Sequence, residues 1–181
     1  MENTGEHIVG QYLRYIKSCD FVEYNLQTEF TQGEIDIVAI NSTKNIVYIC
    51  EVATHLETGL QYTKNGKPDN VKRFVSKFEK NIKYAKANFK EYEHKFMLWT
   101  PIVKIPKKAN PVNNQLQDLS NIQEKILNKY NTHITLIYNE TFLKNINQLR
   151  QISLNTTQAM NSPIMRFLQI EEKLNQHCEK I

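Results

Sequence analysis

Glycine and proline are scarce in this chain, with five of each among 181 residues. This composition excludes a collagen-like repeat and a disordered Pro/Gly-rich protein, and no repeat of fixed period indicates a solenoid. No apolar run approaches the length of a membrane-spanning helix, and the amino-terminal segment MENTGEHIVG resembles no targeting leader. We therefore expect one globular domain over residues 1–181, located in the cytoplasm and outside membranes.

Cysteine is also rare, and its three positions are far apart. Cys19, Cys50 and Cys178 are odd in number and show no paired spacing, which excludes a disulfide framework and a zinc site. The sequence also has no phosphate-cradling Gly-rich loop and no nucleophile elbow. The chemistry of the chain must therefore come from other groups.

Charge is distributed unevenly along the chain, although the net charge is only +4. The segment 64–108 contains thirteen Lys or Arg and four acidic residues, a net charge of +9, so the remainder carries −5. A cluster of this density can attract a polyanion through counterion release. The alternative is a solvated helix face rich in lysine, and charge alone leaves both interpretations open.

Hydrophobic periodicity predicts alternating helices and strands. We expect helices at 4–18, 70–89, 113–130, 140–150 and 163–178, and strands at 20–26, 33–40, 45–52, 94–103 and 133–139. Residues 56–69 are typical of a loop. This order predicts an α/β fold with a mixed central β-sheet flanked by helices on both faces.

Two carboxylates interrupt the apolar strands predicted at 33–40 and 45–52. If these strands pair through the short turn between them, Asp36 and Glu51 meet at one end of the sheet. Buried carboxylates are costly unless they are compensated, and a divalent cation is an effective compensation. The alternative is that each acid faces solvent or pairs with a lysine.

Three segments resemble a known superfamily. GEHIVGQYL in the first helix, followed by GEIDIVAI and VYICEV, is similar to the PD-(D/E)XK nucleases, particularly the Gly-Glu-Ile-Asp branch that includes archaeal Holliday-junction resolvases and many type II restriction enzymes. The resemblance covers roughly the first half of the chain and implies a restriction-endonuclease-like core. It further implies that Mg²⁺ or Mn²⁺ is bound by Asp36, Glu51 and the carbonyl of Val52, with Glu6 as a nearby acid.

The chain departs from the family pattern at position 53, where the E-x-K motif has lysine and this sequence has alanine. That lysine normally positions the attacking water and stabilises charge on the phosphate. Three explanations compete. First, Lys77 can supply the cation from the following helix, with Lys72 and Lys64 as weaker alternatives. On a helical wheel Lys77 and Asn81 lie at the edge of an apolar stripe, which comprises Val71, Phe74, Val75, Phe78, Ile82, Ala85 and Phe89. Second, His55 can substitute. Third, Ala53 marks an engineered or natural loss of activity.

The sequence thus predicts a Mg²⁺-dependent DNA endonuclease that acts in restriction, another form of defence, or DNA processing. Cleavage of a duplex needs two cuts, so we expect a homodimer. The residues expected to contact the nucleic acid are Tyr62, Lys64, Lys67, Lys72 and Arg73. The alternatives are a nuclease-fold subunit that binds nucleic acid or a partner without cutting it, and a scaffold without a nucleic-acid ligand. The sequence does not distinguish DNA from RNA.

Overall fold

The computed structural model describes residues 3–28, 33–106 and 113–179, and within them a five-stranded sheet forms the centre of the molecule. The strands are β1 (Phe21–Gln27), β2 (Glu34–Asn41), β3 (Ile46–Val52), β6 (Glu93–Thr100) and β7 (Ile134–Tyr138). They lie in the order β1-β2-β3-β6-β7. β1, β2 and β3 pair in antiparallel fashion, whereas β3, β6 and β7 are parallel. The sheet is therefore mixed, as predicted.

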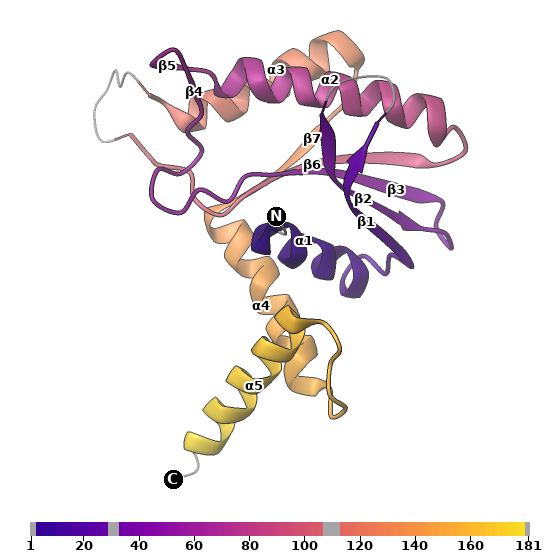
Figure 1. The fold of residues 1–181 in the computed structure, drawn as a ribbon, viewed down its shortest axis with the longest axis vertical. Coiled ribbons are helices and arrows are strands. Elements are labelled where there is room, and N and C mark those ends of the chain that lie inside the picture. Colours follow the sequence, from indigo (N-terminus) through magenta and orange to yellow (C-terminus); the bar gives the residue numbers. More distant parts are fainter. Residues whose placement is uncertain (1–2, 29–32, 107–112, 180–181) are drawn as a thin grey trace.

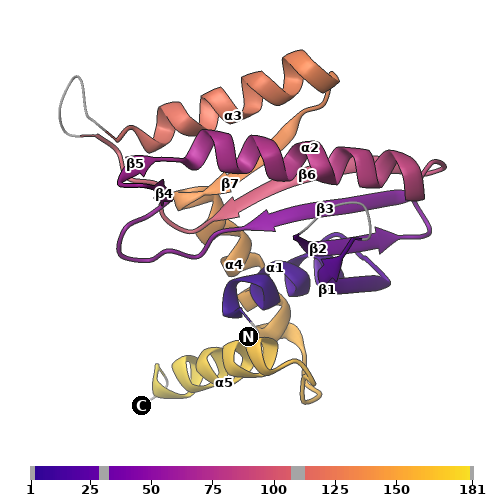
Figure 2. The ribbon, with the colours of Figure 1, turned by 45° about the horizontal axis from the view of Figure 1, so that its top comes forward.

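Helices cover both faces of this sheet in the described part of the chain (Figure 1). They are α1 (Thr4–Tyr15), α2 (Asn70–Asn88), α3 (Gln115–Tyr130), α4 (Asn139–Asn155) and α5 (Pro163–Cys178). In the turned view of Figure 2, α2 and α3 lie on one side of the sheet, and α1, α4 and α5 lie on the other. The predicted α/β class with a mixed sheet between helices is confirmed, and it is compatible with a restriction-endonuclease-like core.

The apolar stripe of α2 fixes this helix against the sheet. Phe74, Phe78, Ile82 and Ala85 recur at helical spacing and are all buried, together with Ile49 of β3. Burial of each large side chain stabilises the fold by about 1.5–3 kcal/mol. The predicted stripe is thus correct, and the residues at its edge are held at a fixed distance from β2 and β3.

The pairing of β2 with β3 brings the two acidic positions to the same end of the sheet. Asn41 lies opposite Ile46 beside the connecting turn, and Ile37 lies opposite Cys50. Asp36 and Glu51 are the next positions along each strand. The turn itself contains Asn45 in the left-handed region at φ 52°, a conformation that asparagine tolerates better than most residues.

Several details differ from the sequence-based expectations. The first helix ends at Tyr15 rather than at residue 18, β6 ends at Thr100 rather than at residue 103, and α4 extends to Asn155 rather than to residue 150. The N-cap of the first helix is Asn3, whose side chain accepts a hydrogen bond from the Gly5 amide. The segment 56–69, predicted as a loop, contains a short hairpin of β4 (Thr63–Lys64) and β5 (Lys67–Pro68).

None of the helices in the described ranges has the length and apolar character that a membrane crossing requires.

Candidate active site

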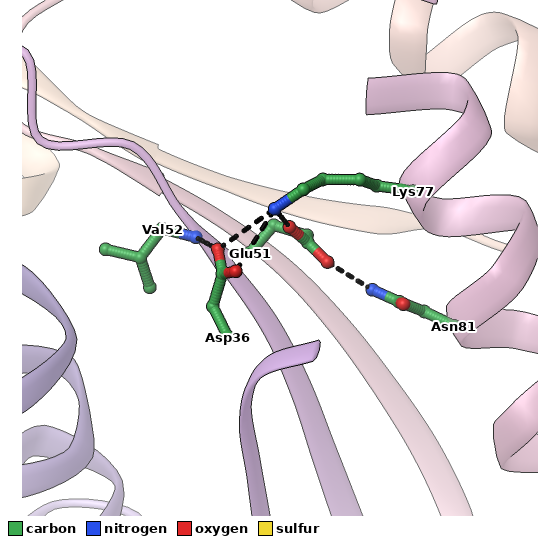
Figure 3. Close-up of polar contacts among 5 residues, drawn as sticks. All are labelled: Asp36, Glu51, Val52, Lys77 and Asn81. Carbon is green, nitrogen blue, oxygen red and sulfur yellow. Dashed lines mark hydrogen bonds and ion pairs between the residues drawn. The ribbon is translucent and has the colours of Figure 1, made fainter. Parts of the chain in front are cut away.

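Asp36, Glu51 and Lys77 form one ion-pair cluster between the sheet and α2 (Figure 3). The Lys77 ammonium lies 3.1 Å from Asp36 Oδ1 and 3.4 Å from Asp36 Oδ2, and it also donates to Glu51 Oε2. Glu51 is completely buried, and Asp36 is 5 % exposed. Side chains from β2, β3 and the more distant α2 therefore meet at one point. We call these three residues the carboxylate–lysine cluster.

Each carboxylate has a second hydrogen bond that fixes its orientation. The backbone amide of Val52 donates to Asp36 Oδ2 at 2.7 Å, and the side-chain amide of Asn81 donates to Glu51 Oε1 at 2.7 Å. Asn81 lies one helical turn beyond Lys77 on α2, so both side chains reach the sheet from the same helix face. All four carboxylate oxygens are consequently hydrogen-bonded, and neither acid is an uncompensated buried charge.

The electrostatics of the carboxylate–lysine cluster favour an additional positive charge. Burial raises the pKa of Glu51 from the ordinary 4.5 to about 8, and the negative charge of Asp36 adds to this, while Lys77 and Asn81 act against it. Burial alone would lower the pKa of Lys77, but its attraction to Glu51 and Asp36 outweighs that effect and raises the pKa. The carboxylate–lysine cluster therefore holds one ammonium against two carboxyl groups, and the raised pKa of Glu51 reflects this excess of acidic groups.

The beginning of α1 lies against the end of β3 and brings Glu6 to this region. The hydroxyl of Thr54 donates to Asn3 Oδ1 at 3.0 Å, and a Cβ on Gly5 would lie 1.9 Å from the Thr54 methyl group. Only glycine at position 5 permits this close approach. Glu6 is buried, and burial followed by the negative charge of Asp36 raises its pKa. The predicted helix-borne acid is therefore electrostatically coupled to the cluster.

The donor set fits a hard divalent cation. Asp36 and Glu51 offer carboxylate oxygens from adjacent strands, the type of ligand that Mg²⁺ and Mn²⁺ prefer. No group of three or more His, Cys, Asp or Glu side chains suitable for a metal occurs in the described residues. A metal at this position would thus be held by two carboxylates, with backbone oxygen or water completing its coordination. The carbonyl of Val52 as a further ligand stays a prediction.

His55 lies outside the carboxylate–lysine cluster as the structure describes it. Its ring makes an edge contact with Tyr62 at 4.8 Å between centroids, and Tyr62 in turn packs against Phe74 at 5.6 Å. The guanidinium of Arg73 lies over the Tyr62 ring at 4.2 Å. The role of His55 in proton transfer and that of Tyr62 in base stacking both stay predictions, and Tyr62 already has two aromatic neighbours and a cation.

Ala53 is buried and belongs to the apolar cluster between the sheet and α2, which also contains Ile49 and Phe74. Its amide donates to the Trp99 carbonyl at 2.8 Å, so position 53 continues the alignment of β3 with β6. The cation expected from the E-x-K motif is absent at position 53, and Lys77 provides an ammonium at the carboxylates from α2 instead. This is the arrangement that the first of the three sequence-based explanations predicts.

A cleft of about 530 Å³ opens beside the carboxylate–lysine cluster, and its lining includes Lys77 and Asn81. Further basic groups on its wall come from α2, with acidic groups from β2 and from the residue before the helix: Lys72, Arg73, Lys80, Glu34 and Asp69. The predicted contacts Lys72 and Arg73 therefore line this cleft. Lys64 and Lys67 lie on the exposed β4–β5 hairpin. Lys107 and Lys108, part of the basic segment, are outside the described residues.

Two residues of this region had no role assigned from the sequence. Asn81 was visible on the helical wheel beside Lys77, but its partner Glu51 is thirty positions away, and only the fold reveals the contact. Asn25 interrupts β1 in the left-handed conformation at φ 52°, between the paired positions Tyr24–Ile37 and Leu26–Ile35. Its side chain lowers the pKa of Glu6, against the burial that raises it. An asparagine within an apolar strand pattern was the available signal for this break.

Comparison of the chain with protein-family models, with curated proteins and with solved structures found no match. The resemblance of three sequence segments to the PD-(D/E)XK nucleases therefore stays a prediction.

Proposed function

We propose that this protein is a Mg²⁺-dependent endonuclease that hydrolyses phosphodiester bonds in DNA. The observation that carries the proposal is the convergence of Asp36, Glu51 and Lys77 at one point, with the carboxylates on adjacent strands and the ammonium on α2. The two acids belong to the GEIDIVAI and VYICEV motifs, whose resemblance to the PD-(D/E)XK nucleases leads to the same expectation. Mn²⁺ is the alternative metal, since both ions take oxygen ligands.

The residues of the carboxylate–lysine cluster and their neighbours would have separate roles in this hydrolysis. Asp36 and Glu51 hold the metal, which when bound supplies positive charge to the phosphate and acidifies water. Lys77 provides the ammonium that stabilises negative charge developing on the phosphate, in place of a lysine at position 53. Asn81 keeps the Glu51 carboxylate oriented through its 2.7 Å hydrogen bond. Glu6, whose pKa is raised by burial and by the charge of Asp36, would contribute a further carboxyl group that can orient the attacking water.

The basic wall of the cleft supports nucleic acid as the substrate. Lys72, Arg73 and Lys77 line it from one face of α2, directly beside the carboxylates. Such groups can contact successive phosphates without reading the sequence of bases. DNA is the preferred substrate, and the protein would cleave it in restriction, another form of defence or DNA processing. A homodimer would permit two cuts in a duplex.

The test is incubation of the purified protein with supercoiled plasmid in Mg²⁺ or Mn²⁺. We expect nicking or linearisation by the wild type, no cleavage in EDTA, and a loss of at least about 100-fold in Asp36→Asn. Glu23→Gln is the matched control, because Glu23 is an exposed acid on the neighbouring strand β1 and does not line the cleft. The proposal is wrong if the wild type leaves plasmid intact with both metals, and a gel shift without cleavage would favour the non-cutting nuclease-fold subunit.

A further inference from the structure

Lys77 occupies the space between the two carboxylates that a shared metal would need. Its ammonium is hydrogen-bonded to Glu51 Oε2 and to Asp36 Oδ1, with a longer contact of 3.4 Å to Asp36 Oδ2. Asp36 Oδ2 also accepts from the Val52 amide, and Glu51 Oε1 accepts from Asn81. A cation that bridges Asp36 and Glu51 therefore meets an ammonium already in place on the oxygens that face each other.

The remaining contacts of the carboxylates do not depend on Lys77. The Val52 amide belongs to the backbone of β3, and Asn81 is a buried residue of α2. Both hydrogen bonds can persist when Lys77 leaves, so the two acids would keep their orientation. The Lys77 side chain can move into the cleft, because it is 29 % exposed and lines that cleft.

We propose that Lys77 is an exchangeable counter-ion of the carboxylate pair, which competes with the divalent metal for Asp36 and Glu51 and moves into the cleft when the metal binds. This inference rests on the proposed function for the identity of the metal. It adds that Lys77 opposes metal binding, although the same ammonium promotes cleavage. Displaced into the cleft, it raises the positive charge available to a phosphate, so the metal and the nucleic acid assist each other's binding.

The test is a titration of the nucleic-acid-free protein with Mn²⁺. Binding is measured by calorimetry and by the electron paramagnetic resonance signal of free Mn²⁺. Lys77→Met removes the competing charge and keeps the length of the side chain. We expect this variant to bind Mn²⁺ at least about tenfold more tightly than the wild type, the effect of losing one hydrogen bond between charged groups. Lys83→Met, an exposed lysine of the same helix, should bind like the wild type.

A second variant keeps the inference testable if Lys77→Met does not fold without metal. Lys77→Arg retains the charge and can hold both carboxylates through its planar, forked donors, so it should bind Mn²⁺ more weakly than the wild type. Equal or weaker binding by Lys77→Met, or tighter binding by Lys77→Arg, would overturn the inference. Absence of Mn²⁺ binding in all variants would overturn it as well.

Plasmid cleavage separates this inference from the proposed function. Cleavage by the wild type together with unchanged Mn²⁺ affinity in Lys77→Met rejects the counter-ion and leaves the nuclease. Tighter Mn²⁺ binding by Lys77→Met together with an inactive wild type supports the counter-ion and rejects the nuclease.

Discussion

The stability of this protein should depend on pH through Glu51, and Glu51→Gln is expected to remove most of that dependence. Burial and the charge of Asp36 raise the pKa of Glu51 to about 8 in the folded protein, compared with an ordinary 4.5. Between these values the folded chain holds a proton that the unfolded chain has lost. This proton stabilises the folded protein. The stabilisation is fully present below pH 4.5 and is lost progressively as the pH rises to about 8.

The size of the effect follows from the width of that interval. Each pH unit within it lowers the free energy of unfolding by up to about 1.4 kcal/mol, so the ceiling for the whole interval is about 5 kcal/mol. The glutamine side chain introduced by Glu51→Gln would be neutral at every pH and nearly identical in shape, so the variant should show a much flatter curve. A small slope of the same sign will remain, because burial also raises the pKa of Glu6.

The assay is urea unfolding at pH 5, 6, 7, 8 and 9 in the presence of a chelator, with m-values compared to verify two-state behaviour. Glu57→Gln is the matched control, since Glu57 is an exposed acid in the loop after β3. This control should keep the wild-type slope. A Glu51→Gln curve parallel to that of the wild type between pH 5 and 8 would refute the reasoning.

Three further substitutions probe the surroundings of the cluster. Asn81→Leu leaves a buried oxygen of Glu51 without its donor and should lower the free energy of unfolding by about 1–3 kcal/mol in a urea titration, and a loss no larger than that of the exposed Asn88→Leu would contradict this. Ala53→Lys should not increase the rate of plasmid cleavage, because Lys77 already supplies the cation. It should lower the free energy of unfolding by about 1–3 kcal/mol, because it overpacks a buried position. A large gain in rate would instead identify Ala53 as the cause of a lost activity. Asn25→Ala should lower thermal stability by about 1–2 kcal/mol because of the left-handed φ, with Asn25→Gly much closer to the wild type, and equal losses in both variants would argue that the side-chain contact with Glu6 matters more.

Much of the fold was predictable because its signals are local. Short apolar runs rich in β-branched residues predicted β2 and β3, and the stripe of Phe74, Phe78 and Ile82 predicted the length and buried face of α2. The wheel of α2 also selected Lys77 among its neighbouring lysines, since that residue lies at the edge of the stripe. Periodicity is sufficient for these features because each depends on residues within a few positions of one another.

The remaining features depend on contacts between distant segments. That one lysine would join Asp36 and Glu51, and that Asn81 and the Val52 amide would take the other oxygens, follows from the distance between α2 and the sheet. The residue types were visible in the sequence, but their distances were not. The hairpin formed by residues 63–68 was hidden for another reason, because strands of two residues are too short to show alternation.

The central claim is that Lys77 performs, from α2, the task of the lysine missing at position 53. The most direct measurement is the single-turnover rate of cleavage of end-labelled duplex DNA at saturating Mg²⁺ by the wild type, Lys77→Met and Lys83→Met. Our account predicts a fall of about 100-fold or more for Lys77→Met and a rate within about twofold of the wild type for Lys83→Met. A rate for Lys77→Met equal to that of the wild type would contradict it.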